Sequence, residues 1–367
     1  MGKNILFIND RLHAGGVEIV LESIIHHLTE KGCRVTIWAF EGSQSDLKKY
    51  PEGIRWRRFP FWRGDSRRFS PKWFFHRGFQ ILFEGIILKL KKWDTVVAFK
   101  EGTSMILASK LRTEKRIGWI HTDYSAFHWS CYNFHSNEEE RKCMQRFDHM
   151  VCVSEAAKQS VIDTIGDPGN LVVRYNPIDV NAILAASQEE LCRKPEGKTL
   201  LVSVGRLTEV KRFDMLIDIC SRLSKVYPLE LWIFGSGELE VDLRHQIEES
   251  DSDAIRLISG RKNPYPYFAC ADWVISSSKS ESYGLTIQEA LILGKPVLSV
   301  ACPAIAESVP EGCGILVGFS EEDLEAGIRD ILEHPHLNER CRASIDKLYN
   351  RNLLWADRLN AIAELLI

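Results

Sequence analysis

The chain has 367 residues, of which 45% are hydrophobic and 26% charged, with a formal net charge of −3 and a pI near 6.4. This composition is ordinary for a globular protein of about two domains, and it argues against a chain that binds nucleic acid as a whole. The ten cysteines form no Cys-x-x-Cys pair and no secretory signal is visible. We therefore expect reduced thiols in a cytoplasmic protein.

In the first half of the chain, short apolar runs alternate with helical patterns. Residues 4–9 form a first apolar run, a Gly-Gly loop follows, and residues 17–31 carry apolar side chains at helical spacing up to Gly32. Further strands are predicted at residues 34–40, 95–99, 116–120, 149–154 and 170–175. Strands that alternate with helices predict a mainly parallel sheet.

The pattern restarts after residue 178. An Asn-Pro turn and a polar stretch precede strands predicted at residues 199–207, 229–237, 255–259, 272–278, 296–300 and 314–317. We therefore expect two α/β domains, residues 1–178 and 179–351, joined by a linker near residues 175–186. Residues 352–367 predict a terminal helix that packs back on the first domain.

Loops at the carboxyl ends of the predicted strands carry residues suited to phosphate, because ligands of open α/β sheets bind beyond these strand ends. Gly15 and Gly16 open a helix whose N–H groups could face an anion, and a plain turn is the alternative. Arg206 and Lys211 suit a diphosphate, although a solvated loop is the commoner fate of such a pair. The loop at 234–240 lacks the third glycine of a dinucleotide fingerprint, so an NAD site is poorly supported.

The segment ESYGLTIQE places Glu281 just before a predicted helix and Glu289 inside it. A buried carboxylate is costly unless it is hydrogen-bonded. The two glutamates are therefore either solvated or hold a ligand, Glu289 a ribose diol and Glu281 a sugar. The backbone amides of Tyr283, Gly284 and Leu285 lie at the start of this helix and could hold phosphate oxygens.

Together these segments resemble retaining glycosyltransferases of family 4, whose GT-B fold consists of two Rossmann-like domains that face each other across a cleft. The resemblance spans nearly the whole chain and is strongest from residue 204 to residue 297. It rests on the segments HAGGVE at 13–18, YNPID at 175–179, VGRLTEVKRFDMLI at 204–217 and the E-x7-E motif at 281–289.

The resemblance implies roles for individual residues. Glu289 would bind the nucleotide ribose, Glu281 the transferred sugar, and the cations the diphosphate. The implied catalytic residues are His121, Arg206, Lys211 and Glu281. The implied donor-binding residues are Gly15, Gly16, Arg206, Lys211, Glu281, Ser282, Tyr283, Gly284, Leu285 and Glu289.

His121, in the segment WIHTDY, corresponds to the active-site histidine of the family. Many members have an aspartate directly after this histidine, whereas Thr122 precedes Asp123 here, which puts a role for Asp123 in doubt. Departure of the nucleotide builds negative charge, which Arg206, Lys211 and helix-end amides would stabilise. We therefore expect no metal and no cofactor, and the resemblance implies same-face attack in which the leaving phosphate takes the acceptor's proton.

Two further clusters of side chains have both a functional and a structural interpretation. His128, Cys131, His135 and Cys143 do not have a standard zinc spacing, so a loop near the acceptor site is favoured over a metal site. Residues 55–77 are strongly basic and interleaved with aromatics. An anionic membrane surface is the favoured partner of this segment, and a loop packed on the first domain with exposed arginines is the alternative.

The sequence thus predicts a cytoplasmic retaining glycosyltransferase, peripheral on the inner face of the cell membrane, with no nucleic-acid partner. We expect transfer from a nucleotide-diphosphate sugar, UDP-linked, to a lipid-linked saccharide acceptor in surface polysaccharide synthesis. A GT-B glycosyl phosphorylase and a non-catalytic GT-B partner subunit that binds sugar or protein are the alternatives. The joint presence of the two cations, the two glutamates and the histidine argues against the partner subunit.

Overall fold

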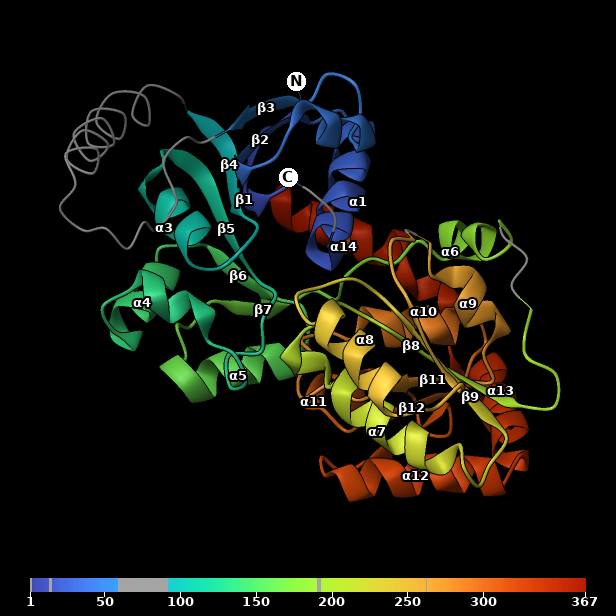
Figure 1. The fold of residues 1–367 in the computed structure, drawn as a ribbon. Coiled ribbons are helices and arrows are strands. Elements are labelled where there is room, and N and C mark those ends of the chain that lie inside the picture. Colours follow the sequence, from blue (N-terminus) through green and yellow to red (C-terminus); the bar gives the residue numbers. More distant parts are fainter. Residues whose placement is uncertain (1, 13–14, 59–91, 190–192, 262) are drawn as a thin grey trace. The chain divides into compact units, whose positions relative to one another are not determined.

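The computed structural model describes residues 2–12, 15–58, 92–189, 193–261 and 263–367 (Figure 1). The chain divides into two compact units. Unit 1 comprises Met1–Ile178 and Trp355–Ile367, and unit 2 comprises Asp179–Leu354. Each unit contains one parallel sheet flanked by helices, which confirms the predicted α/β class.

The sheet of unit 1 has the strand order β3-β2-β1-β4-β5-β6-β7. Its strands are β1 (Asn4–Arg11), β2 (Arg34–Glu41), β3 (Arg55–Arg58), β4 (Trp93–Ala98), β5 (Thr113–Ile120), β6 (His149–Cys152) and β7 (Leu171–Val173). Strand β1 pairs with β2 on one side and with β4 on the other, so the order of the sheet reverses between β1 and β4. Strand β3 was not predicted, because its sequence Arg-Trp-Arg-Arg is an exposed edge without an apolar face.

Helices cover this sheet and bury their apolar stripes against it. They are α1 (Gly16–Glu30), α3 (Thr103–Lys110), α4 (Asn137–Met144), α5 (Glu155–Ile165) and α14 (Ala356–Leu366), with 3-10 turns η1 (Gln44–Lys49) and η2 (Trp129–Asn133). The helix predicted for residues 352–367 is divided, because Trp355 has a non-helical backbone and separates α14 from the turn η4 (Arg351–Leu354). Helix α14 belongs to unit 1, where Thr95 on β4 donates a hydrogen bond of 2.8 Å to the carbonyl of Leu366.

The sheet of unit 2 has the strand order β10-β9-β8-β11-β12-β13, so its order reverses between β8 and β11. The strands are β8 (Thr199–Val204), β9 (Leu229–Phe234), β10 (Ile255–Ile258), β11 (Trp273–Ser276), β12 (Val297–Val300) and β13 (Gly314–Val317). The helices are α6 (Val180–Ala186), α7 (Phe213–Leu223), α8 (Glu240–Glu249), α9 (Tyr265–Cys270), α10 (Leu285–Ile292), α11 (Pro303–Ser308), α12 (Glu321–Glu333) and α13 (His336–Leu348). The turn η3 (Glu209–Lys211) lies between β8 and α7.

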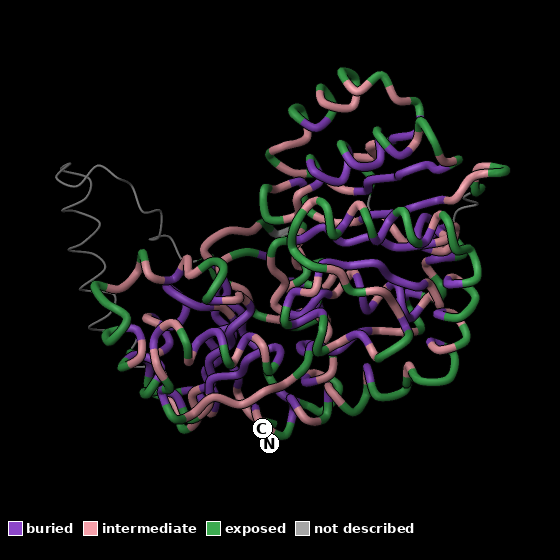
Figure 2. The backbone as a smooth tube through the Cα atoms, turned by 90° about the horizontal axis from the view of Figure 1, so that it is seen from below, coloured by how far each residue is buried: buried purple, intermediate pink, exposed green. Residues whose placement is uncertain are grey.

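Two apolar layers, one on each face of the sheet, form the core of unit 2. Because helices cover both faces, the central strands are mostly apolar and do not alternate regularly with polar residues. Figure 2 shows buried stretches of chain inside each unit and exposed residues toward its outside. In the part of the chain that the structure describes, no helix combines the length and apolar character needed to cross a membrane.

Candidate active site

In unit 2, the predicted diphosphate and sugar residues lie together at the point where the strand order reverses. Arg206 and Lys211 follow β8, and Glu281 follows β11, its neighbour in the sheet. The ammonium of Lys211 donates to the carboxylate of Glu281 over 2.5 Å, and the two side chains are 20% and 14% exposed. Ligands of open α/β sheets bind at such switch points. The structure thus brings Lys211 and Glu281 into contact, and their binding of a donor stays a prediction.

The backbone around Lys211 is fixed by the neighbouring strand. The hydroxyl of Ser277, just after β11, contacts the carbonyl of Lys211 at 2.6 Å and that of Arg212 at 3.1 Å. Arg212 has a left-handed conformation with φ 50°, which ends the turn η3 and begins α7. A Cβ on Gly205 would lie 3.3 Å from Cε of Lys211, so this glycine lets the lysine pass close to the strand end.

Arg206 differs from Lys211 in its surroundings. Its side chain is exposed, and among the described residues it has neither an ion-pair nor a hydrogen-bond partner. Its guanidinium is therefore available to an anion, whereas the charge of Lys211 is compensated by Glu281. A guanidinium presents a planar fork of donors that matches a phosphate better than a single ammonium does.

Glu289 lies on α10 and receives a hydrogen bond from the hydroxyl of Tyr265, on α9, at 3.3 Å. Burial raises the pKa of Glu289 to about 7, and the hydrogen bond from Tyr265 opposes part of this shift. Burial also raises the pKa of Tyr265, with the nearby carboxylate adding to the effect. Sequence reasoning missed Tyr265. The only signal was an aromatic residue in the Asn-Pro-Tyr turn that begins α9.

Gly284 directly precedes α10, and its backbone conformation disfavours any other residue. It has φ 73°, and a Cβ there would lie 2.2 Å from Cδ1 of Ile305. Tyr283 is 3% exposed, so its side chain belongs to the core and only its backbone could serve a ligand. The segment from Ser282 to Leu285 therefore presents backbone N–H groups at the start of a helix, as the sequence predicted for phosphate oxygens.

The glycines of the 234–240 loop have a packing role. A Cβ on Gly235 would lie 2.0 Å from the carbonyl oxygen of Gly205, and one on Gly237 would lie 2.4 Å from that of Leu207. The amide of Leu207 donates to the carbonyl of Ser236 over 3.0 Å. These glycines allow the loops after β8 and β9 to meet backbone to backbone, which supports the loop that carries Arg206.

In unit 1, His121 directly follows β5 and is held by a buried carboxylate. Glu101, fully buried after β4, accepts hydrogen bonds from the backbone amides of His121 at 2.5 Å and Thr122 at 2.9 Å. Burial raises the pKa of Glu101. Burial, with a contribution from the charge of Lys100, lowers the pKa of His121 to about 3, so the imidazole is neutral. Sequence reasoning missed Glu101, although an acidic residue directly after a predicted strand was the available signal.

Gly15 and Gly16 lie where α1 begins, as predicted, but a protein carboxylate already lies there. A Cβ on Gly15 would be 2.4 Å from Oε2 of Glu18, which means that this carboxylate lies against the first residues of the helix. Acidic side chains stabilise the positive end of a helix. A phosphate that bound these amides would therefore compete with Glu18.

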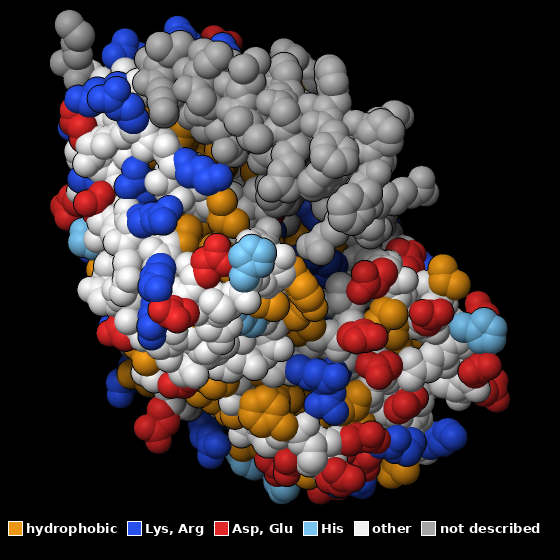
Figure 3. Space-filling model, turned by 90° about the vertical axis from the view of Figure 1, so that its left-hand side faces the viewer, with side chains coloured by type: hydrophobic (Ala, Val, Ile, Leu, Met, Phe, Trp, Pro, Cys, Tyr) orange, Lys and Arg blue, Asp and Glu red, His pale blue; other side chains and the backbone are white. Residues whose placement is uncertain are grey.

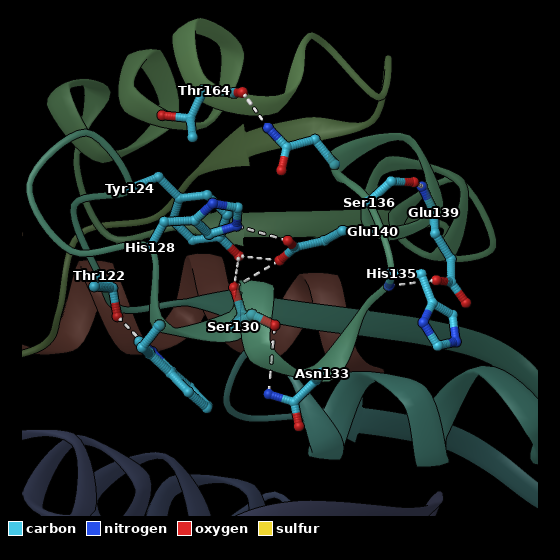
Figure 4. A network of polar contacts seen from close by, with 12 residues as sticks. Thr122, Tyr124, His128, Ser130, Asn133, His135, Ser136, Glu139, Glu140 and Thr164 are labelled. Carbon is cyan, nitrogen blue, oxygen red and sulfur yellow. Dashed lines mark hydrogen bonds and ion pairs between the residues drawn. The ribbon is translucent and has the colours of Figure 1, made fainter.

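The loop after His121 is organised by a buried network (Figure 4). Fully buried Glu140, on α4, bonds to Tyr124 at 2.9 Å, to Ser130 at 2.7 Å and to Nε2 of His128 at 2.6 Å. The ring of His128 is thus held by its contact with Glu140. Over the described ranges, no group of three or more His, Cys, Asp or Glu side chains could hold a metal ion. Two carboxylates that are close in sequence, Asp251 and Asp253, also bear on the question of a metal ion. They lie at the amino end of β10, the opposite end of that strand from the site.

Comparisons with known proteins show which family the chain is similar to. The family "Glycosyltransferase Family 4" matches residues 14–182, and the family "Glycosyl transferases group 1" matches residues 188–347. The alpha-monoglucosyldiacylglycerol synthase of Streptococcus pneumoniae is 24% identical over 357 residues, which cover 91% of this chain and 78% of that protein. The lipopolysaccharide core biosynthesis glycosyltransferase LpsE of Rhizobium meliloti is 30% identical over 154 residues, 41% of this chain and 44% of LpsE.

Solved structures share the fold over nearly the whole chain. The Anabaena protein HepE in complex with UDP and glucose superposes with a TM-score of 0.74 at 18% identity, covering 99% of this chain and 98% of HepE. The lipopolysaccharide glycosyltransferase WaaG superposes with a TM-score of 0.65 at 15% identity, covering 99% of each chain. The two family matches span both units, one in each, and the chain therefore belongs to the group 1, family 4 glycosyltransferases and has their GT-B fold.

Proposed function

We propose that this glycosyltransferase moves a sugar, with retention of anomeric configuration, from a UDP-sugar to a lipid-linked saccharide acceptor in surface polysaccharide or glycolipid synthesis. Unit 2 binds the donor and unit 1 the acceptor. The observation that carries the proposal is the Lys211–Glu281 pair at the reversal point of the sheet, where the same loop carries the exposed Arg206, which has no side-chain partner among the described residues. The HepE complexes with UDP-glucose support the choice of donor, and the name of the pneumococcal synthase supports a lipid acceptor.

The donor groups divide among the residues of unit 2. Arg206 and Lys211 hold the diphosphate, Glu289 accepts hydrogen bonds from the ribose hydroxyls, and Glu281 accepts them from the transferred sugar. Without donor, Lys211 and Glu281 satisfy each other at 2.5 Å. Donor binding replaces this contact by two others, ammonium to phosphate and carboxylate to sugar hydroxyl. Because the cations are held before the reaction, they stabilise the charge of the leaving diphosphate as it forms.

Retention follows from attack on the face that the diphosphate leaves. A leaving phosphate oxygen accepts the proton of the acceptor hydroxyl, so the step needs no protein base. His121, with a pKa lowered to about 3, is neutral and cannot supply a proton as an acid near neutral pH. We propose that it acts by hydrogen bonding near the donor sugar, on a backbone held by Glu101.

The membrane part of the proposal rests on residues 55–77, of which 59–77 lie outside the described residues. Strand β3 is described, and Arg55, Arg57 and Arg58 on it are exposed. Figure 3 shows a face on which both acidic and basic side chains of the described residues reach the surface. An excess of positive charge would therefore come from β3 and the segment after it, and each such cation adds about 1 kcal/mol near an anionic surface.

Sedimentation with liposomes tests this contact. We expect the protein to pellet with vesicles that contain anionic lipid, less so at high salt, and less after Arg55, Arg57 and Arg58 are changed to Glu. The control reverses three exposed cations of unit 2, Lys225, Arg340 and Lys347. Equal pelleting of the wild type and the β3 variant would remove the membrane surface from the proposal.

Release of nucleotide from a panel of UDP- and GDP-sugars, with and without EDTA, tests the donor proposal. We expect slow release of UDP without acceptor and no loss with EDTA. The anomeric configuration of a transferred sugar, read by NMR, tests retention. A protein that binds UDP-sugars but never cleaves them would support the non-catalytic partner subunit.

A further inference from the structure

Unit 1 has a charged pair at its own reversal point, which the sequence reading did not single out. Asp10 lies near the end of β1, and Lys100 follows β4, its neighbour in the sheet (Figure 1). Nζ of Lys100 lies 3.6 Å from Oδ2 of Asp10, and the side chains are 25% and 22% exposed. The hydroxyl of Ser104, on α3, donates to Oδ1 of Asp10 over 3.0 Å. The pair therefore occupies the same topological position as the donor residues of unit 2.

Among the residues that the structure describes, this pair has unused hydrogen-bonding capacity. A distance of 3.6 Å exceeds a direct hydrogen bond, so the ammonium and the carboxylate attract each other without satisfying each other. An ammonium has three donors and a carboxylate about four acceptor positions. Lys100 also lies over the indole ring of Trp129, 5.2 Å from its centroid. Charge, acceptor and aromatic surface thus meet at one place with partial access to solvent.

Buried polar atoms without partners gather at the same strand ends. They are Oδ1 of Asn9 near the end of β1, Oε2 of Glu101 after β4 and Nε2 of His121 after β5. None of these three atoms has a hydrogen bond to a described residue. The three side chains are 0%, 0% and 9% exposed. Buried polar groups in native proteins are nearly always satisfied, and exceptions call for a ligand, a water or a catalytic role. Their concentration at three adjacent strand ends indicates a place built to receive polar groups.

The indole of Trp129 is held rigidly. Its Nε1 donates to the hydroxyl of Thr122 over 3.2 Å, and the residues on either side of it, His128 and Ser130, are tied to Glu140 by the buried network (Figure 4). A ring whose position is fixed before binding loses little conformational freedom when a ligand packs on it.

We propose that Asp10, Lys100 and Trp129 form a saccharide subsite in unit 1 that recognises the acceptor. Adjacent hydroxyls of a sugar donate to the carboxylate of Asp10 and accept from the ammonium of Lys100, while the indole supplies apolar contact for the C–H groups of the ring. The ligand is an uncharged sugar, because a phosphate would gain from Lys100 but would be repelled by Asp10. This inference rests on the proposed function, because the subsite would bind the acceptor of the proposed transfer reaction.

Titration of the full-length protein, with 15N-labelled tryptophan, tests the subsite. The probes are the methyl α-glycosides of glucose, galactose, mannose and N-acetylglucosamine, each added with UDP present. Loss of one signal in Trp129→Phe assigns the indole N–H of Trp129. We expect at least one glycoside to shift this signal saturably, and Asp10→Asn and Lys100→Met each to weaken the binding at least tenfold.

A second ion pair of unit 1 provides the matched control. Lys92 and Glu114 are in contact at 2.8 Å at the amino ends of β4 and β5, the other edge of the same strands. Lys92→Met should leave the shift of the Trp129 signal and the affinity unchanged. Unaltered indole signals of the remaining tryptophans in each variant show that the fold is retained.

Either of two results would overturn the subsite: no glycoside shifts the Trp129 signal, or Asp10→Asn and Lys100→Met bind as tightly as the wild type. Release of UDP from the donor without acceptor separates this failure from failure of the proposed function. That reaction should persist in the wild type and in the control Lys92→Met, whose residue lies at the other edge of the same strands. Its absence in the wild type would instead remove the transfer reaction itself.

Discussion

At the scale of single residues, two opposite charges of the proposed donor site, Lys211 and Glu281, are in contact. The Lys211–Glu281 contact is short and mostly buried, so each side chain is held in place by the other. Arg206 has no such partner among the described residues, and its side chain is exposed. Under the proposed function the two cations would contribute differently: Lys211 would exchange a partner when donor binds, whereas Arg206 would only gain one.

Lys211→Ala and Arg206→Ala should each lower kcat/KM for donor turnover by about a hundredfold or more, because each removes a preorganised charge from the leaving group. The exposed Lys225, just after α7, provides the control in Lys225→Ala. Steady-state kinetics with UDP-sugar, together with thermal unfolding, measure the effect. Turnover near the wild-type rate in both site variants would contradict the assignment.

Glu289 should make nucleotide binding depend on pH near neutrality. Its pKa is raised to about 7 by burial, so the carboxylate that accepts ribose hydroxyls is lost as the pH falls through 7. If only the ionised form binds, affinity for UDP should rise about tenfold between pH 6 and pH 8 and then level off. Calorimetry across this range measures the rise.

Two variants isolate the contribution of Glu289. The same titration with Glu289→Gln subtracts the ionisation of the phosphate of UDP, and its remaining profile should be flatter. Tyr265→Phe removes the hydrogen bond that favours the ionised carboxylate, so the rise should move to higher pH. Identical profiles for the wild type and Glu289→Gln would show that this carboxylate does not contact the ribose.

The residues of the site that could be predicted are those whose chemistry is visible in a local segment. Arg206, Lys211 and Glu281 follow predicted strands, and parallel strands bring their carboxyl ends to one edge of the sheet. Tyr265 and Glu101 were missed because each acts on a side chain or amide in another element, and such pairing depends on packing between elements.

At the scale of elements, the start of α10 depends on one glycine. Gly284→Ala should destabilise the fold because its φ of 73° is unfavourable for alanine and the new methyl group would overlap Ile305. Gly260 provides the control, since its φ is 75° but nothing lies within 4 Å of a Cβ there. We expect Gly284→Ala to lower the free energy of unfolding by about 1–3 kcal/mol more than Gly260→Ala, measured with urea. Equal losses of unfolding free energy in the two variants would mean that the side chain of Ile305 moves aside without destabilising the fold.

The elements also show where sequence patterns end. Every strand predicted from an apolar run is present, and the central ones, such as β1, β4, β8 and β9, are largely buried. Strand β3 was missed since its pairing with β2, not its side chains, makes it a strand. The division of the last helix at Trp355 was missed as well, because nothing in the local sequence marks the place where the chain passes from unit 2 to unit 1.

At the scale of the whole molecule, unit 1 depends on the end of the chain. Leu366 is fully buried on α14, and its carbonyl accepts the hydrogen bond from Thr95. Leu366→Ala should lower the free energy of unfolding of unit 1 by about 2–5 kcal/mol. Its neighbour Ile367 is 41% exposed, and Ile367→Ala should cost about 0.5 kcal/mol or less.

Hydrogen exchange followed by mass spectrometry locates this effect. Leu366→Ala should speed exchange in β4, with which α14 makes its buried hydrogen bond, and leave the sheet of unit 2 unchanged. Faster exchange in both units alike would show that they unfold together, and that the helix does not act on unit 1 alone.

Unit 1 consists of two separate parts of the chain, and this affects the order in which its elements are made during translation. The seven strands of its sheet leave the ribosome first, but residues 355–367 emerge only after the whole of unit 2 has been made. Unit 2 is continuous and can complete its fold while the nascent sheet before it still exposes the apolar surface that α14 covers. Until the last helix arrives, that surface is a target for chaperones and proteases. A chain that ends before residue 355 would therefore contain all but the last part of the described fold: the whole of unit 2 and an incomplete unit 1.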